Sequence, residues 1–278
     1  MHAVKIALAF ALVGCFALGC SSETAPPSAT PDAGGADVAT VADAGVTMKP
    51  DVPEAVATLI RARPYQSLVP LQYDPATPMP LVVVLHGYGA NGFVQAGYLG
   101  LSALARTRGF LLAYPNGTMD RSGRLFWNAT DACCDFARTN VDDVAYITAV
   151  IDDMSARYRV DARRVFLVGH SNGGFMAHRM ACDRPTRIAA FVSLAGAFTN
   201  SPMRCTPSAP VAALQVHGTA DDVIRFEGGS TVGGPATMYP SARDSVAAWG
   251  RLNRCGALMM TAQHLDLETS VMGAETVV

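Results

Sequence analysis

Charged residues are scarce in this sequence. Asp, Glu, Lys and Arg make up 16% of 278 residues, the formal net charge is −2, and no basic run is interleaved with aromatic residues. Nucleic-acid-binding proteins need a basic surface, so this composition argues against a nucleic-acid partner. Internal repeats are also missing. What is present, with 50% apolar residues, is the composition of a globular chain long enough for one sizeable core.

Metal-binding patterns are lacking as well. The cysteine spacings match no zinc site, and no histidine lies near the adjacent pair Cys133 and Cys134, so we predict neither a metal nor an organic cofactor. The sequence has seven cysteines: Cys15, Cys20, Cys133, Cys134, Cys182, Cys205 and Cys255. Without the first two, five remain as disulfide candidates. Because five is odd, one of them is free or pairs outside this chain.

Residues 1–20 have the pattern of a bacterial lipoprotein signal. A short positive region at Lys5 precedes the apolar run Ile6 to Leu18, which is too short to span a membrane comfortably. Cys15 and Cys20 both stand in lipobox-like contexts. We favour Cys20 as the lipidated residue, because a polar segment follows it; an ordinary cleaved signal is the alternative. Either way, we expect a bacterial protein outside the cytoplasm, extracellular, on the outer cell surface or in the periplasm. A lipid anchor at Cys20 would be its only contact with a membrane.

Residues 21–55 are rich in Ala, Pro, Thr, Asp and Gly and show no apolar periodicity. Such a segment buries too little apolar surface to offset its ordering entropy, so we predict a disordered tether. Residues 56–278 are predicted to form one catalytic domain.

Short, continuous apolar runs alternate with helical patterns in this domain. Helices are predicted from Asp142 to Tyr158 and from Phe175 to Cys182. The predicted strands are 81–85, 110–114, 165–168, 189–194 and 211–216. Continuous apolar strands suit a mostly parallel sheet covered on both faces, so we predict a doubly wound α/β fold. Active sites of such sheets lie at the carboxyl ends of the strands.

The strongest motif is Gly169-His170-Ser171-Asn172-Gly173, between a predicted strand and a predicted helix. The G-x-S-x-G pattern forms a sharp turn that exposes the serine hydroxyl, and small flanking residues avoid collisions with the neighbouring strand and helix. We therefore predict Ser171 as a nucleophile. His170 is expected to be structural, because its position points away from the hydroxyl.

Two further segments complete a predicted acyl-transfer site. The glycine-rich run His86 to Asn91 directly follows a strand, and acyl transfer needs donors aimed at the developing oxyanion. We assign this role to the backbone N–H groups of Tyr88 and Asn172, with His86 bracing the loop. A glycine-rich turn without function is the alternative.

The run His217 to Val223 follows a later strand, where the acid of a catalytic triad is found in this fold. Asp221 fits that position, where it would orient the base histidine, and Asp222 is its rival. Asp142 and Asp143 stand at a helix start and are interpreted as N-terminal caps.

The ordered set of motifs resembles the extracellular polyhydroxybutyrate depolymerase and feruloyl esterase group of α/β-hydrolases, from about Pro64 onward. The marks are the segments 86–89, 114–117, 126–128 with Cys133-Cys134, 141–144, the Ser171 turn, and 217–221 with Gly228-Gly229. The resemblance implies an α/β-hydrolase fold in which Ser171 attacks an ester carbonyl and Asp221 is the triad acid. The implied substrate is a hydroxyalkanoate oligomer or an acyl ester on a polysaccharide. Trp127 and Tyr88 would flank the acyl pocket, although either could equally be core.

The base histidine departs from the family pattern. Members carry a histidine in a glycine-rich loop after the last strand, whereas here only His264 follows Asp221, without those neighbours. We therefore expect the chain to lack its C-terminal strand and histidine, and as it stands to be poorly active or unstable, while a longer parent is active. The alternatives are that His264 is the base, or that the protein is a degenerate relative.

Three functions compete at this stage. A serine carboxylic ester hydrolase leads. A serine peptidase of the same fold is its rival, because the Ser171 turn cannot tell an ester from an amide. A surface-anchored, catalytically degenerate polymer-binding lipoprotein is the third.

Overall fold

The computed structural model describes residues 52–201, 204–231, 237–256, 264–265 and 276–277. The predicted signal, both candidate lipidation sites (Cys15 and Cys20) and most of the predicted tether lie outside these residues. The first helix, α1 (Glu54–Ala62), begins close to the predicted start of the domain. In the part of the chain that is described, no helix is long and apolar enough to cross a membrane.

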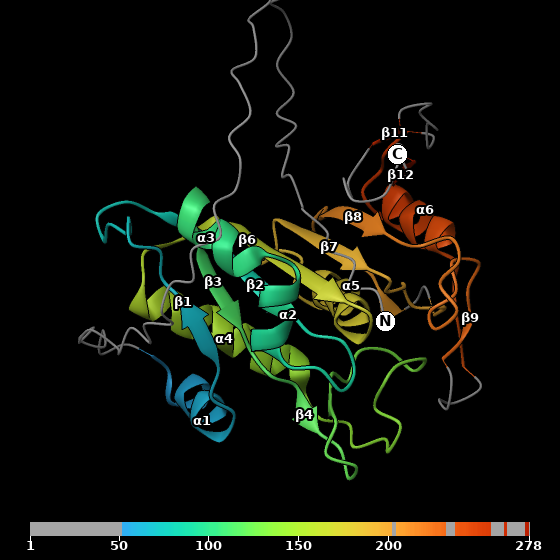
Figure 1. The fold of residues 1–278 in the computed structure, drawn as a ribbon, viewed down its shortest axis with the longest axis horizontal. Coiled ribbons are helices and arrows are strands. Elements are labelled where there is room, and N and C mark those ends of the chain that lie inside the picture. Colours follow the sequence, from blue (N-terminus) through green and yellow to red (C-terminus); the bar gives the residue numbers. More distant parts are fainter. Residues whose placement is uncertain (1–51, 202–203, 232–236, 257–263, 266–275, 278) are drawn as a thin grey trace, which may run out of the picture.

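Six strands form the central sheet in the order β1-β3-β2-β6-β7-β8 (Figure 1). Their bounds are β1 Gln66–Leu68, β2 Met79–Leu85, β3 Leu111–Tyr114, β6 Val160–His170, β7 Ala190–Leu194 and β8 Ala212–Val216. The edge strand β1 pairs antiparallel with β3, and all other pairs are parallel. The mostly parallel sheet and its five predicted strands are therefore confirmed, and β1 is an addition.

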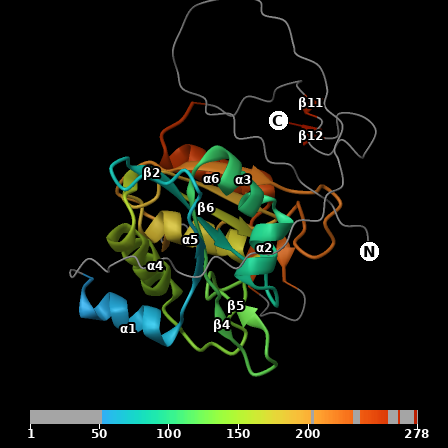
Figure 2. The same ribbon diagram turned by 60° about the vertical axis from the view of Figure 1, so that its left-hand side comes forward.

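Helices cover both faces of the sheet. Figure 2 shows α4 and α2 on opposite sides of β2 and β6. The helix bounds are α2 Gly92–Tyr98, α3 Leu101–Arg108, α4 Asp143–Arg157, α5 Asn172–Asp183 and α6 Ala242–Leu252. Alternate residues of β2 point to the two layers: Leu81 and Val83 pack with α4 and α5, whereas Val82 packs with α2 and α3. This double cover explains why the middle strands are apolar without interruption.

Three two-stranded antiparallel sheets lie outside the central sheet. They are β4 (Thr118–Met119) with β5 (Leu125–Phe126), β9 (Gly229–Ser230) with β10 (Met238–Tyr239), and β11 (His264–Leu265) with β12 (Thr276–Val277). Our expectation that the C-terminal strand of the domain is missing concerns residues after Gly256. Most of them lie outside the described part.

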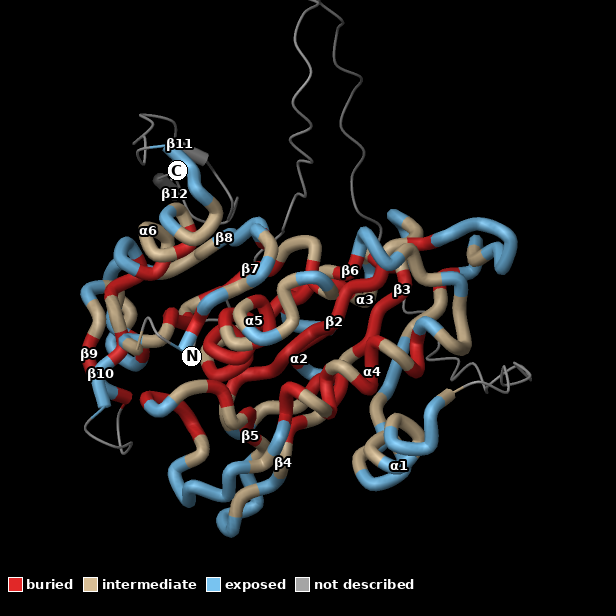
Figure 3. The backbone as a smooth tube through the Cα atoms, turned by 180° about the vertical axis from the view of Figure 1, so that it is seen from behind, coloured by how far each residue is buried: buried red, intermediate tan, exposed pale blue. Residues whose placement is uncertain are grey.

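Burial falls from the centre of the sheet toward β8. Six of the seven residues of β2 are buried, whereas the first three residues of β8 are exposed. Figure 3 shows the middle strands in red and β8 in pale blue and tan. The carboxyl ends of β2, β6, β7 and β8 lie at one edge of the sheet, because these strands are parallel. That edge is where the predicted site residues emerge.

Candidate active site

Ser171 occupies the sharp turn between β6 and α5. Its φ of 53° and ψ of −119° place a non-glycine residue in a strained region of backbone space. The backbone N–H of Ser171 donates to the carbonyl of Leu194 at 2.7 Å, which ties the turn to the end of β7. Such strain persists only where the surroundings enforce it, so the turn is built to present this one side chain.

Backbone crowding explains the glycines around Ser171. A Cβ added to Gly169 would lie 2.0 Å from the carbonyl oxygen of Gly173, and a Cβ added to Gly173 would lie 2.0 Å from that of Leu85. Both distances are far below van der Waals contact. The strand, the turn and the helix therefore approach so closely that only glycine fits.

The loop after β2 lies directly against the serine turn. A Cβ added to Gly87 would meet the Cβ of Ser171 at 3.4 Å and a ring nitrogen of His170 at 3.3 Å. The buried side-chain oxygen of Gln95, on α2, accepts from the N–H of Gly87 and lies 3.3 Å from the same His170 nitrogen. Burial lowers the pKa of His170, and the nearby Asp221 charge partly offsets that effect. Gln95 is a site neighbour that sequence patterns did not reveal, since nothing marks a lone polar residue in a short helix.

His86 braces this loop from within the core. Its Nε2 accepts from the N–H of Gly117 at 2.9 Å, so its Nδ1 carries the proton and donates to the carbonyl of Gly87 at 2.8 Å. The side chain is fully buried, and burial lowers the pKa of His86 to about 4. A neutral imidazole that uses both nitrogens in this way is structural.

Two backbone N–H groups next to the Ser171 turn have no hydrogen-bond partner among the described residues. They are the N–H groups of Tyr88 and Asn172. The Tyr88 side chain is held outward, because its hydroxyl donates to Asp120 and its ring contacts Phe136 edge-on at 5.4 Å. Burial and the Asp120 carboxylate raise the pKa of Tyr88. The amide of Asn172 is the first of α5, and such N-terminal amides favour negative charge.

Asp221 follows β8 and is oriented by its own loop. Its Oδ1 accepts from the N–H groups of Val223 and Ile224, both at 2.9 Å. Its Oδ2 lies 3.7 Å from Nε2 of His217, which is closer to the Ile224 carbonyl at 2.6 Å. The side chain of Asp221 is 21% exposed. The rival, Asp222, is exposed.

The structure corrects our placement of Trp127 at the acyl pocket. Trp127 is 0% exposed, and its ring packs against His86 and Tyr146 in the core. Of the two interpretations offered by the sequence, the core one fits. Tyr88, by contrast, is partly exposed beside the Ser171 turn.

The two carboxylates at the start of α4 differ from each other. Asp142 caps the helix as predicted, since its side chain accepts from the N–H of Ala145 at 2.9 Å. Asp143 does not act as a cap. It is fully buried, pairs with Arg63 at 2.6 Å and accepts from the N–H of Asn128 at 2.7 Å. Burial raises the pKa of Asp143, and Arg63 partly offsets the shift.

The base of a triad is not visible among the described side chains. Four histidine side chains are described, and none hydrogen-bonds to Ser171: His86, His170, His178 and His217. His264 lies in β11, whose backbone pairs with β12, and its side chain is outside the described part. The described residues also include no group of three or more His, Cys, Asp or Glu suited to hold a metal ion.

The cysteines form two disulfides. Cys133 pairs with Cys134, and Cys182 pairs with Cys205. Cys255 is exposed and free. Cys255 is thus the odd cysteine among the described residues, and both possibilities that we considered for it, a free thiol or a partner outside this chain, stay open.

Two cavities of about 350 and 380 Å³ lie away from the serine. They share a wall formed by Thr130, Asp131, Phe198 and Thr199, and Ser171 lines neither of them. Neither cavity is therefore the space in front of the nucleophile.

Comparisons with known proteins find related esterases. The chain is 33% identical over 196 residues to NocK of Nocardia uniformis subsp. tsuyamanensis, covering 69% of this chain and 53% of NocK. It is 32% identical over 181 residues to feruloyl esterase C of Emericella nidulans, covering 62% of this chain and 60% of that enzyme. The chain thus spans little more than half the length of these relatives.

Two crystal structures share the fold. A thermostable esterase aligns with a TM-score of 0.51 at 19% identity, over 68% of this chain and 48% of its own. The Bacillus cereus carboxylesterase aligns with a TM-score of 0.50 at 15% identity, over 72% of this chain and 84% of its own. The fold is therefore that of the α/β-hydrolases, as predicted. The family model for esterase PHB depolymerases matches residues 71–253, so the chain belongs to that family.

Proposed function

We propose that this protein is a serine carboxylic ester hydrolase that works through an acyl-enzyme on Ser171. The observation that supports the proposal best is the strained turn at Ser171, beside two backbone amides that have no acceptor among the described residues. The Oγ of Ser171 attacks the ester carbonyl carbon. The developing oxyanion accepts hydrogen bonds from the N–H groups of Tyr88 and Asn172. The alcohol then leaves, and water hydrolyses the acyl-enzyme.

This chemistry requires a base to remove the proton of Ser171, because a serine hydroxyl is a weak nucleophile at neutral pH. A histidine oriented by Asp221 would take that proton and return it to the leaving alcohol. His264 is the histidine that follows Asp221 in the printed sequence. The substitution His264→Ala therefore tests one candidate for the base directly.

The proposed substrates are hydroxyalkanoate oligomers or acyl esters carried by polysaccharides. The family name and the feruloyl esterase relative favour these esters. A bifunctional acetylxylan esterase/xylanase of Neocallimastix patriciarum, 28% identical over 148 residues, also favours them; the match covers 53% of this chain and 20% of that protein. We also propose secretion with a lipid anchor at Cys20. Two disulfides suit an oxidising compartment.

The test combines fluorophosphonate labelling with turnover of p-nitrophenyl butyrate. We expect labelling at Ser171, and we expect Ser171→Ala to abolish both signals. Ser155→Ala is the matched control, because Ser155 is an exposed serine on α4 that bonds only locally to the Ile151 carbonyl. Labelling with preferential cleavage of p-nitroanilides would identify a peptidase instead. Absence of labelling would favour a polymer-binding protein without catalysis.

A further inference from the structure

We propose that Trp127 is a positioning residue that holds the two halves of the oxyanion site at a fixed separation. The inference rests on the proposed function, since it concerns the amides of Tyr88 and Asn172. These two donors belong to different elements, the loop after β2 and the first turn of α5. A donor that stabilises an oxyanion must be held in place before the reaction begins.

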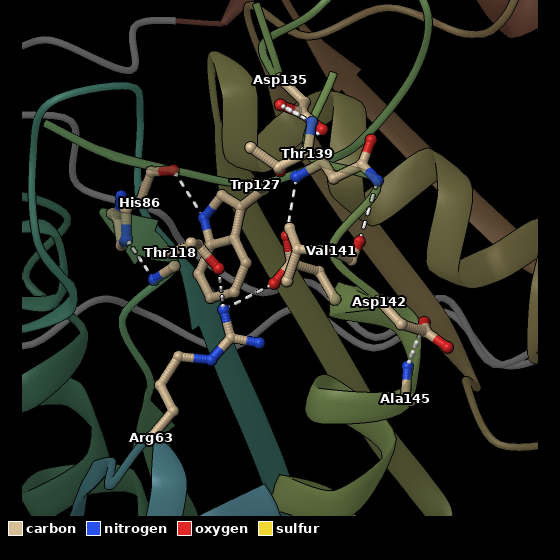
Figure 4. Close-up of polar contacts among 12 residues, drawn as sticks. Arg63, His86, Thr118, Trp127, Asp135, Thr139, Val141, Asp142 and Ala145 are labelled. Carbon is tan, nitrogen blue, oxygen red and sulfur yellow. Dashed lines mark hydrogen bonds and ion pairs between the residues drawn. The ribbon is translucent and has the colours of Figure 1, made fainter. Parts of the chain in front are cut away.

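Trp127 contacts both elements through hydrogen bonds. The side chain of Asn172 forms a pair of bonds with the Trp127 backbone: Oδ1 accepts from the N–H at 2.7 Å, and Nδ2 donates to the carbonyl at 2.9 Å. On the other side, the Trp127 indole N–H donates to the carbonyl of His86 at 3.0 Å, as Figure 4 shows. That carbonyl is two residues before Tyr88. One residue thus connects the two amide-bearing segments.

Burial makes this connection stiff. Trp127, His86 and Asn172 are each 0% exposed, so water does not compete for their hydrogen bonds. The ring of Trp127 packs on the ring of His86 with centroids 5.0 Å apart. Nδ2 of Asn172 also donates to the sulfur of Cys133 at 3.6 Å, so the side-chain amide has a second partner. Every polar group of the Asn172 side chain is therefore engaged, whereas its backbone N–H has no acceptor among the described residues.

We call the hydrogen bonds of Trp127 to His86 and Asn172 the clamp. Its effect is expected in the transition state. Negative charge develops on the carbonyl oxygen only during attack, so a displaced donor lowers kcat and leaves KM nearly unchanged. Loss of one oxyanion donor lowers kcat by about 10²–10³. A donor that is displaced rather than removed should lose part of that factor, about 10- to 100-fold.

The chain contains a matched control for this residue. Trp249, on α6, is 1% exposed, and its indole N–H donates to Nδ1 of His178 at 2.8 Å. Unlike Trp127, it packs against Phe191 and Phe198. Trp127→Phe and Trp249→Phe each remove one buried indole hydrogen bond and keep an aromatic ring. A general packing defect would affect the two variants alike.

The experiment measures kcat and KM for p-nitrophenyl butyrate, with thermal unfolding of each variant. We expect Trp127→Phe to lower kcat about 10- to 100-fold with KM within about 3-fold, and Trp249→Phe to change kcat less than about 3-fold. Asn172→Ala keeps the backbone donor but breaks the other end of the clamp, and should also lower kcat. Because the two residues act as a unit, the double variant should lose about as much kcat as the more damaging single variant, rather than the product of the two losses.

Each outcome decides the matter. Trp127→Phe with wild-type kcat, or Trp249→Phe with an equal loss, overturns the positioning role. If Trp127→Phe does not fold, Asn172→Ala carries the test, and a kcat within about 3-fold of wild type rejects the clamp. The wild type and Ser171→Ala report on the proposed function separately: if their turnover is equal, the function fails, and the clamp is rejected with it.

Discussion

β6, which ends one residue before Ser171, and β8, which ends at Val216 before Asp221, belong to one sheet but are covered very differently. Residues 167–169 of β6, near the turn, are buried and paired on both sides, by β2 and by β7. β8 pairs with β7, and its first three residues are exposed. The proposed nucleophile therefore emerges from the centre of the sheet and the proposed acid from a thinly covered strand.

The two residues are also held in place differently. Ser171 sits in a strained conformation, which surrounding contacts must impose continuously. The Asp221 carboxylate is oriented by two hydrogen bonds within its own loop. Close packing is thus concentrated where the backbone is strained, and a few local bonds suffice where one side chain must be oriented.

The largest expected effect is the difference between alanine substitutions at two glycines, Gly173 and Gly218. Gly173→Ala should abolish activity and prevent stable folding, because the new Cβ would lie 2.0 Å from the Leu85 carbonyl oxygen. Gly218→Ala, in the loop after β8, should change the free energy of unfolding by less than about 0.5 kcal/mol, since nothing lies within 4 Å of its added Cβ. Soluble expression and thermal unfolding of the pair measure this contrast. A folded, active Gly173→Ala protein would contradict the crowding of the turn.

A smaller contrast is expected for two leucines. Leu81 of β2 is 0% exposed, so Leu81→Ala should lower the free energy of unfolding by about 2–5 kcal/mol. Leu214 of β8 is 51% exposed, and Leu214→Ala should lower it by less than about 1 kcal/mol. Urea unfolding of both variants gives the two values. Equal losses would mean that β8 is as well covered as the centre of the sheet.

The same contrast decides what the sequence could predict. The middle strands were predictable, because strands buried on both faces read as continuous apolar runs. β1, with two exposed residues out of three, has no such signal and is a strand because it pairs with β3. Helix α2 begins at the capping residue Asn91, but its seven residues are too few for a clear helical period.

The candidate site divides in a similar way. The Ser171 turn was predictable, because its glycines are a local requirement of the backbone. The role of Trp127 was not, because sequence spacing does not show that residues 86, 127 and 172 meet. Their contacts depend on how the loop after β5 folds over the start of α5, and only the tertiary structure supplies that.

The smallest effect concerns two buried histidines, one at the centre and one beneath β8. His86 braces the loop after β2, whereas Nε2 of His178, on α5, lies 3.2 Å from the side-chain oxygen of Gln215 on β8. Burial lowers the pKa of each from 6.5 to about 4. Below pH 6.5 the unfolded chain therefore binds protons that the folded protein does not, so stability falls as the pH drops toward 4. At pH 5 the loss relative to pH 7 should be about 2 kcal/mol per histidine, in conditions where most carboxylates remain ionised.

Urea unfolding at pH 7, 6 and 5 measures this loss. His178→Gln should remove about half of the pH dependence contributed by the pair, because glutamine does not titrate. Amide hydrogen exchange then distinguishes the two regions. Protonation of His178 adds a proton to Nδ1 and so removes the acceptor of the Trp249 indole N–H on α6, which packs against β8. The amides of β8 should therefore exchange faster at pH 5 relative to those of β2, after correction for the intrinsic pH effect on exchange. If β2 and β8 lose protection equally, the thinly covered strand does not open on its own, and the centre and the edge of the sheet unfold as one cooperative unit.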